Sequence, residues 1–136
     1  MTHVLHLRAE PAAPLGCDMS AAADTPDERL RDYKRLFERA LLHRERRADA
    51  VVFIFRADPD TRPAADDLAR REAACCPFLD YRVETVGDEV IWTITNTIAG
   101  DGRASVDVIL DAFHDLPDHA GSDLAGMLDR IAARDV

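Results

Sequence analysis

Two adjacent cysteines, Cys75 and Cys76, follow a glutamate and precede Pro77. If residues 64–76 are wound as a helix at about 100° per residue, Glu72 falls inside the apolar arc, about 60° from Cys75 and about 40° from Cys76. A carboxylate on a buried face is costly unless it is ion-paired, ligates a metal or takes up a proton. Because thiolates prefer soft ions, the Glu-x-x-Cys-Cys cluster is a candidate site for a soft metal or for thiol chemistry.

The same cluster has a simpler interpretation. Glu72 can accept hydrogen bonds or meet an arginine, while Cys75 and Cys76 pack as small hydrophobic side chains. Adjacent side chains on a rigid helix also diverge by about 100°, which hinders chelation of one ion. Pro77 halts the helix and lets its last turn open, so the objection is weakened. Both interpretations stay open at this point.

A third thiol comes from Cys17, on a segment with the freedom to fold across the second helix. Three cysteines cannot all form disulfides within one chain, and a bond between Cys75 and Cys76 is disfavoured by their short Cα separation. We therefore expect reduced thiols. The predicted metal ligands are Cys75, Cys76, Cys17 and Glu72, and the expected ion is of the Zn, Cu(I) or Hg class.

Other chemistry has weaker support. His3 and His6 lie in an irregular start, and His114 follows an apolar helical stripe. A cysteine nucleophile with Glu72 or His114 as base is the enzymatic alternative. No GxGxxG or GxxxxGK[ST] run occurs, so we expect no nucleotide cofactor.

Composition limits the partners. The 136-residue chain is 47% hydrophobic and 32% charged, with a net charge of −9. This charge disfavours nucleic acids and anionic membranes. No apolar run reaches the length of about 20 residues that spans a bilayer, and no signal-peptide core is present. We expect a cytoplasmic protein.

Hydrophobic periodicity predicts seven elements. Thr25–Pro26–Asp27–Glu28 is a capping box that opens a first helix ending near Arg46, whose basic last turn suits a solvated helix end. A buried strand covers 51–55, and a second helix ends at Pro77. Strands 81–86 and 89–97 form a hairpin through Gly87–Asp88. A third helix closes at Leu116–Pro117, and Ser122 caps a fourth.

The predicted fold class is α+β, with helices packed on a small three-stranded, mainly antiparallel sheet in the order α-β-α-β-β-α-α. Residues 1–24 are expected to be an irregular N-terminal segment, and residues 25–136 a single domain.

Three runs of the sequence stand out together: Cys17–Ser20, Glu28–Leu30 with Tyr33 and Leu36–Phe37, and, most specifically, Arg71–Leu79 (REAACCPFL). With them, roughly residues 17–115 resemble a family of small, poorly characterised bacterial proteins that is loosely associated with heavy-metal, especially mercury, resistance. The resemblance implies binding or handling of a thiophilic metal by Cys75 and Cys76, with Cys17 and Glu72 as helpers.

The leading hypothesis is cytoplasmic binding of a soft metal or metalloid ion through Glu72, Cys75 and Cys76, with Cys17 as a third thiolate. One alternative is a non-catalytic interaction module with packed cysteines, forming a homodimer through a sheet edge or the last helix. The other is the small cysteine-dependent enzyme.

Overall fold

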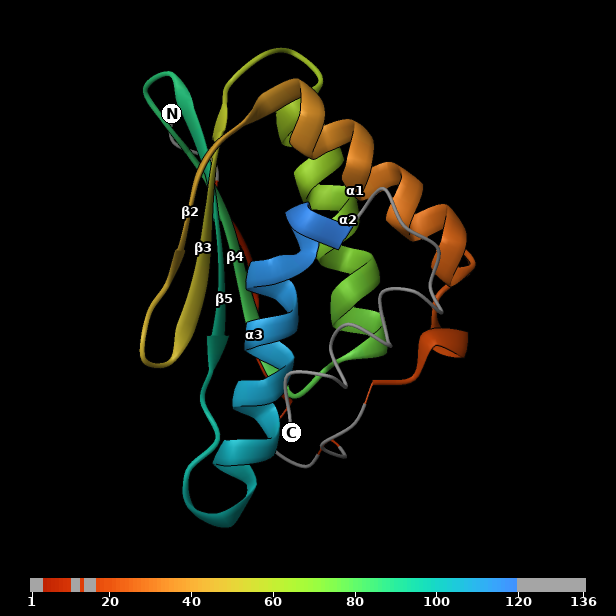
Figure 1. The fold of residues 1–136 in the computed structure, drawn as a ribbon, viewed down its shortest axis with the longest axis vertical. Helices are drawn as coiled ribbons and strands as arrows, with labels where there is room; N and C mark the ends of the chain where they lie inside the picture. The colour runs from red at the N-terminus through yellow and green to blue at the C-terminus, as the bar shows by residue number, and fades with distance from the viewer. Residues whose placement is uncertain (1–3, 11–12, 14–16, 120–136) are drawn as a thin grey trace.

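The computed structural model describes residues 4–10, 13 and 17–119. In this part of the chain, one antiparallel sheet of five strands carries three α-helices on one face (Figure 1). The sheet order is β1-β4-β5-β3-β2, and every pairing is antiparallel. The strands are β1 Val4–Leu7, β2 Leu41–Arg46, β3 Ala50–Arg56, β4 Leu79–Val86 and β5 Glu89–Asn96. The helices are α1 Pro26–Ala40, α2 Thr61–Cys75 and α3 Arg103–His119, with short 3₁₀ turns η1 Met19–Ala21 and η2 Gly100–Gly102.

The α+β class is confirmed, but the predicted three-stranded sheet and the predicted element order are wrong. Two edge strands were missed. Val4–Leu7, expected to be irregular, pairs with β4 as β1. Leu41–Arg46, expected to continue the first helix, pairs with β3 as β2. Both strands are short and polar or interrupted by histidine, so their pairing depends on a neighbouring strand and leaves little periodic signal.

Helix α1 begins as predicted and ends earlier than predicted. Thr25 Oγ1 accepts from the N–H of Glu28 at 3.2 Å, and the Glu28 carboxylate accepts from the N–H of Thr25 at 3.1 Å, which completes the capping box. The helix stops at Ala40, and Leu41 is already extended. The basic run that follows is an edge strand rather than a solvated helix end. Its side chains reach α3, with Arg44 pairing with Asp118 at 3.0 Å and Arg46 with Asp111 at 2.8 Å.

The predicted buried strand and the predicted hairpin are confirmed. Residues 51–55 lie within β3, which occupies an interior position in the sheet. Val86 at the end of β4 pairs with Glu89 at the start of β5, so Gly87 and Asp88 form the two-residue turn. Gly87 has φ +57°, a left-handed conformation that glycine adopts without a Cβ penalty.

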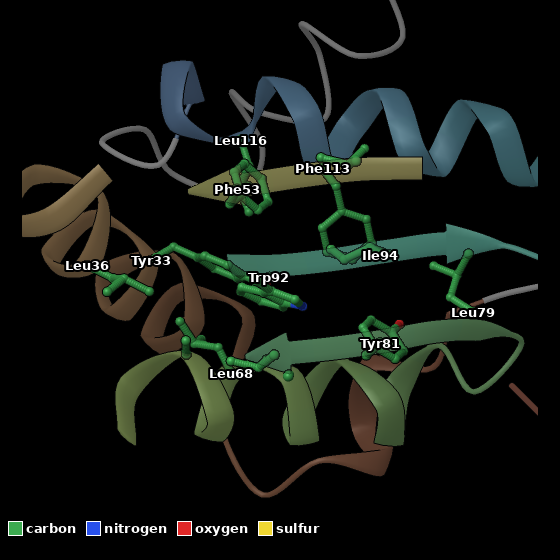
Figure 2. Packing of buried hydrophobic residues seen from close by; sticks show 14 of the residues in the cluster. Tyr33, Leu36, Phe53, Leu68, Leu79, Tyr81, Trp92, Ile94, Phe113 and Leu116 are labelled. Carbon is green, nitrogen blue, oxygen red and sulfur yellow. The ribbon is translucent and has the colours of Figure 1, made fainter. Parts of the chain in front are cut away.

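The core lies between the sheet and the helices (Figure 2). Trp92 of β5 is fully buried, with its ring centroid 6.0 Å from that of Tyr33 on α1 and 6.0 Å from that of Phe53 on β3. Leu68 approaches the same region from α2 (Figure 2). These contacts fix α1 and α2 against the sheet, so the facing side chains of the two helices are held at defined positions.

The C-terminal part differs in one further detail. Helix α3 continues through Pro117 to His119, beyond the predicted stop at Leu116–Pro117. Proline near a helix end removes only one backbone hydrogen bond. The predicted fourth helix after Ser122 lies outside the described residues. Among the helices that the structure describes, none is long and apolar enough to cross a membrane.

Candidate functional site

The C-terminal end of α2 carries the sulfur cluster. Cys75 is the last helical residue, and Cys76 leaves the helix with φ −127° and ψ 68° while its N–H still donates to the carbonyl of Glu72 at 2.7 Å. The hydroxyl of Tyr81 donates to the carbonyl of Cys76 at 2.9 Å. Since the residue after Cys76 is Pro77, the helix cannot continue. The two cysteine side chains therefore start from different backbone conformations.

A disulfide joins Cys17 to Cys76 across 59 residues of sequence. This bond overturns the expectation that the thiols are all reduced, and it places Cys17 at the end of α2. Cys17 is exposed, whereas Cys76 is only 2% exposed. The remaining thiol, that of Cys75, is free and fully buried.

Backbone hydrogen bonds hold the N-terminal segment beside this helix end. The N–H of Asp18 donates to the carbonyl of Cys75 at 2.8 Å, and the N–H of Glu10 donates to the carbonyl of Pro77 at 2.8 Å. The Asp18 carboxylate accepts from the N–H of Ser20, which caps η1. The disulfide of Cys17 and the backbone hydrogen bonds of Glu10 and Asp18 thus all hold this segment beside the end of α2.

Glu72 is buried, as its helical position predicts, and its partner is an arginine. Oε1 of Glu72 lies 3.0 Å from Nη1 of Arg29, which reaches across from α1. The same Nη1 donates to Sγ of Cys75 at 3.3 Å. Arg29 is only 3% exposed and Glu72 only 6% exposed. The guanidinium therefore bridges the carboxylate and the free sulfur in the protein interior.

A second carboxylate completes the environment of Arg29. Asp24, just before α1, accepts from Nη2 and Nε of Arg29 at 2.6 and 3.0 Å. It also accepts from Nη1 of Arg71 at 2.8 Å, and Arg71 in turn contacts Asp32 at 3.0 Å and Asp67 at 2.8 Å. The buried pair is consequently the inner end of an ionic network that runs to the surface between α1 and α2.

The pKa values of these acids move in opposite directions. Burial raises the pKa of Glu72, although the positive charge and hydrogen bond of Arg29 oppose this effect. The hydrogen bond from Arg29 lowers the pKa of Asp24 to about 2, against a smaller effect of burial. Burial, and then the charge of Glu72, raise the pKa of Tyr33, whose ring lies in the core. Arg29 therefore contacts two carboxylates, of which burial disfavours the charged form of Glu72 while hydrogen bonding favours the charged form of Asp24.

The four predicted metal ligands are brought together only in part. Cys17 and Cys76 are bonded to each other, while Glu72 and Cys75 both contact Arg29. Within the part of the chain that the structure describes, no group of three or more His, Cys, Asp or Glu side chains is arranged to hold a metal ion. The structure agrees with the simpler interpretation, in which Glu72 pairs with an arginine, here Arg29.

The proposed base for an enzymatic cysteine has other contacts. His114 lies on α3, where its Nδ1 is 3.3 Å from Asp115 and its carbonyl accepts from Arg44. Burial, and then the positive charge of Arg44, lower the pKa of His114. An oxygen of Glu72, the other proposed base, is held by Arg29. Both proposed bases therefore have other partners, and the charged side chain that contacts Cys75 is Arg29.

Sequence reasoning missed Arg29 and Asp24 as site residues. The signal was available for Arg29, because it shares a helical face with Tyr33, Leu36 and Ala40 at spacings of four, seven and eleven residues. An arginine on the buried stripe of α1 and a glutamate on the buried face of α2 need each other as partners. Asp24 carries no such pattern, because it precedes the helix.

We compared the chain with protein-family models, with curated proteins and with solved structures, and none of the three comparisons gives a match.

Proposed function

We propose that this chain, when its cysteines are reduced, binds a soft metal or metalloid ion through the thiolates of Cys17, Cys75 and Cys76. The observation that carries the proposal is the Cys17–Cys76 disulfide, because it places the third sulfur at the helix end that bears the other two. Reduction of this bond yields three thiols at one end of α2. A set of thiolates favours ions of the Zn²⁺, Cu⁺ and Hg²⁺ class.

Arg29 supports the same proposal through its charge. Three thiolates around a divalent ion carry a net negative charge, and burying that charge is costly without a cation nearby. The Arg29 guanidinium already donates to Sγ of Cys75 at 3.3 Å. We assign Glu72 the role of fixing this guanidinium, through the 3.0 Å contact, in place of the ligand role that the sequence suggested.

The proposal keeps the cytoplasm as the location. In that compartment glutathione and thioredoxin systems keep thiols reduced, and disulfides are usually transient or redox-sensing. The Cys17–Cys76 disulfide has one exposed cysteine, Cys17, and a free thiol nearby. These features suit a disulfide that forms and breaks reversibly better than a permanent structural one.

Titration of the reduced protein tests the proposal. The full chain is reduced, freed of reductant without oxygen and titrated with Zn²⁺, Cu⁺ or Hg²⁺, and the bound ion is counted by native mass spectrometry. We expect one ion per chain, lost when Cys75→Ser and Cys76→Ser are combined. The control is His114→Gln, which removes an imidazole on α3, a group that can bind metals in general. It is expected to leave the number of bound ions per chain unchanged. No binding by wild type, or unchanged binding by the double variant, would overturn the proposal.

A second candidate is a non-catalytic interaction module whose sulfurs serve only structure. The observation that favours it is the burial of Cys75 and Cys76 within the hydrophobic core. This alternative predicts that reduced wild type binds none of the three ions. It also predicts that replacing Cys75 and Cys76 by alanine leaves the binding of a partner unchanged, because in this alternative the sulfurs only pack in the core.

A further inference from the structure

Residues Cys17–Asp24, here called the strap, join the end of α2 to the start of α1. At one end the strap is bonded through Cys17 to Cys76, and its next residue donates a backbone hydrogen bond to the carbonyl of Cys75. At the other end Asp24 pairs with Arg29 at 2.6 Å and with Arg71 at 2.8 Å. The strap is therefore held at both ends beside the free thiol, by a covalent bond at one end and by ion pairs at the other.

The two cysteines of the disulfide differ in their exposure to solvent. Cys17 is exposed and belongs to the strap, whereas Cys76 is 2% exposed and lies against the core. Thiol–disulfide exchange requires a thiolate to reach one of the two sulfurs, and access helps to decide which sulfur is attacked. The exposed cysteine is thus the side from which a reductant in solution can approach.

We propose that the Cys17–Cys76 disulfide gates the ion site and that Cys17 is the sulfur at which an external dithiol enters. This inference rests on the proposed function, because it describes the regulation of that site. In the oxidised chain Cys75 provides the one free thiol. In the reduced chain all three sulfurs are available, and the strap is released from its covalent tie while Asp24 still holds its far end.

The reaction consists of two exchanges. A thiolate of the dithiol attacks Sγ of Cys17, the Cys17–Cys76 bond breaks, and Cys76 leaves as a thiolate that takes up a proton. The second thiol of the reductant, as a thiolate, then attacks the reductant sulfur that is bonded to Cys17. Cys17 leaves as a thiolate and is protonated in turn. The dithiol loses two electrons and two protons and becomes a disulfide, and the chain gains them as two thiols.

The entry site is tested on the oxidised wild-type chain with 2-mercaptoethanol, a monothiol that forms the mixed disulfide and cannot resolve it intramolecularly. A brief exposure is quenched with acid, the remaining thiols are alkylated, and peptide mass mapping locates the adduct. We expect the adduct on Cys17 to exceed that on Cys76 by about tenfold or more, as access dictates. Adducts of equal abundance, or an excess on Cys76, would overturn the assignment of Cys17.

The gate is tested by titrating oxidised and reduced wild type side by side with Cd²⁺. Binding is monitored by the thiolate-to-metal charge-transfer absorption. We expect the reduced chain to bind at least about 100-fold more tightly, since the oxidised chain lacks two of the three thiolates and the loss of even an outer partner of a metal ligand can cost that much. Cys17→Ser is the matched variant, because it cannot form the bond and its affinity should not change with oxidant. Equal binding by both wild-type forms would refute the gate and leave ion binding intact. No binding of Cd²⁺, Zn²⁺, Cu⁺ or Hg²⁺ by the reduced chain would instead refute the proposed function, while the adduct map still decides the entry site.

Discussion

The guanidinium of Arg29 on α1 lies 3.0 Å from the carboxylate of Glu72 on α2, and both side chains are almost completely withdrawn from solvent. A buried ion pair of this kind adds little net stability relative to an apolar pair, because each ion loses its hydration. Removal of one partner is far more damaging, since the other charge then stays buried alone. The pair therefore explains how an acidic side chain is accommodated on the core face of a helix, and it positions a cation beside the free sulfur.

Arg29→Met should lower the free energy of unfolding by about 3 kcal/mol or more, because Glu72 is left as a buried unpaired carboxylate. Urea denaturation of the oxidised chain at neutral pH measures the change. Arg31→Met, on the exposed face of the same helix, is the control and should change stability by less than about 0.5 kcal/mol. The double variant Arg29→Met with Glu72→Leu should recover part of the loss. A double variant no more stable than Arg29→Met alone would contradict this account of the pair.

Acid should remove the stabilisation that Asp24 contributes. Hydrogen bonds from Arg29 lower the pKa of Asp24 from 3.8 to about 2, so the unfolded chain binds this proton more readily than the folded chain. The contribution is therefore complete above about pH 4 and is lost as the pH falls towards 2. Its size is about 2 kcal/mol, at about 1.4 kcal/mol per pKa unit.

Asp24→Asn should accordingly lower stability at neutral pH and flatten the decline between pH 4 and pH 2. Unfolding free energies measured across that range test this expectation. The control is Asp101→Asn, at an exposed position that makes no ion pair within the described residues. If the unfolding free energy of Asp24→Asn declines between pH 4 and pH 2 as steeply as that of wild type, a group other than Asp24 is responsible for the decline.

Reduction of the Cys17–Cys76 bond should cost up to about 4 kcal/mol of stability, because the bond closes a loop of about 60 residues in the unfolded chain. Denaturation curves with and without a dithiol reductant give the difference. Cys75→Ser should keep the response, since this residue is outside the bond, whereas Cys17→Ser should abolish it. If Cys17→Ser still responds to the reductant, the pairing of the cysteines differs from the one described.

Gly87→Ala should destabilise the β4–β5 hairpin by about 1 kcal/mol, because the turn holds this residue at φ +57°. Gly87→Asn is the matched variant and should cost clearly less, since asparagine adopts the left-handed region more readily than alanine. Among the described residues other than the two chain neighbours of Gly87, no atom lies within 4 Å of an added Cβ, so crowding does not contribute to the difference. Thermal unfolding of the three proteins measures it. Equal stabilities of the alanine and asparagine variants would argue against a backbone origin.

Much of the local structure was readable from the sequence. The capping box at Thr25 and the glycine turn at Gly87 each depend on residues a few positions apart, and the structure contains both. The stop at Pro77 follows from the missing N–H of proline. The burial of Glu72 followed from helical periodicity, which is also a property of neighbouring residues.

The two edge strands were decided by tertiary structure. Leu41–Arg46 continues directly from a helix and contains charged residues that a helix accepts equally well. It becomes a strand because β3 offers free backbone groups and because α3 supplies carboxylates for Arg44 and Arg46. Val4–Leu7 likewise owes its extended form to β4. The partner of β1 is far away in the chain, since Val4 pairs with Glu84, so no local pattern encodes that pairing. β2 pairs with the next strand in the chain, and there the helix-compatible composition of Leu41–Arg46 concealed the strand.

By itself, the sequence determined that a carboxylate and two sulfurs share the buried end of one helix, because the spacing of residues 72, 75 and 76 and the proline that follows are local facts. Only the tertiary structure decided their partners. Arg29 is 43 residues away from Glu72, and Cys17 is 59 residues away from Cys76. Such contacts form when packing of α1 and of the N-terminal segment against α2 repays the entropy of closing long loops, and that balance is a property of the whole fold.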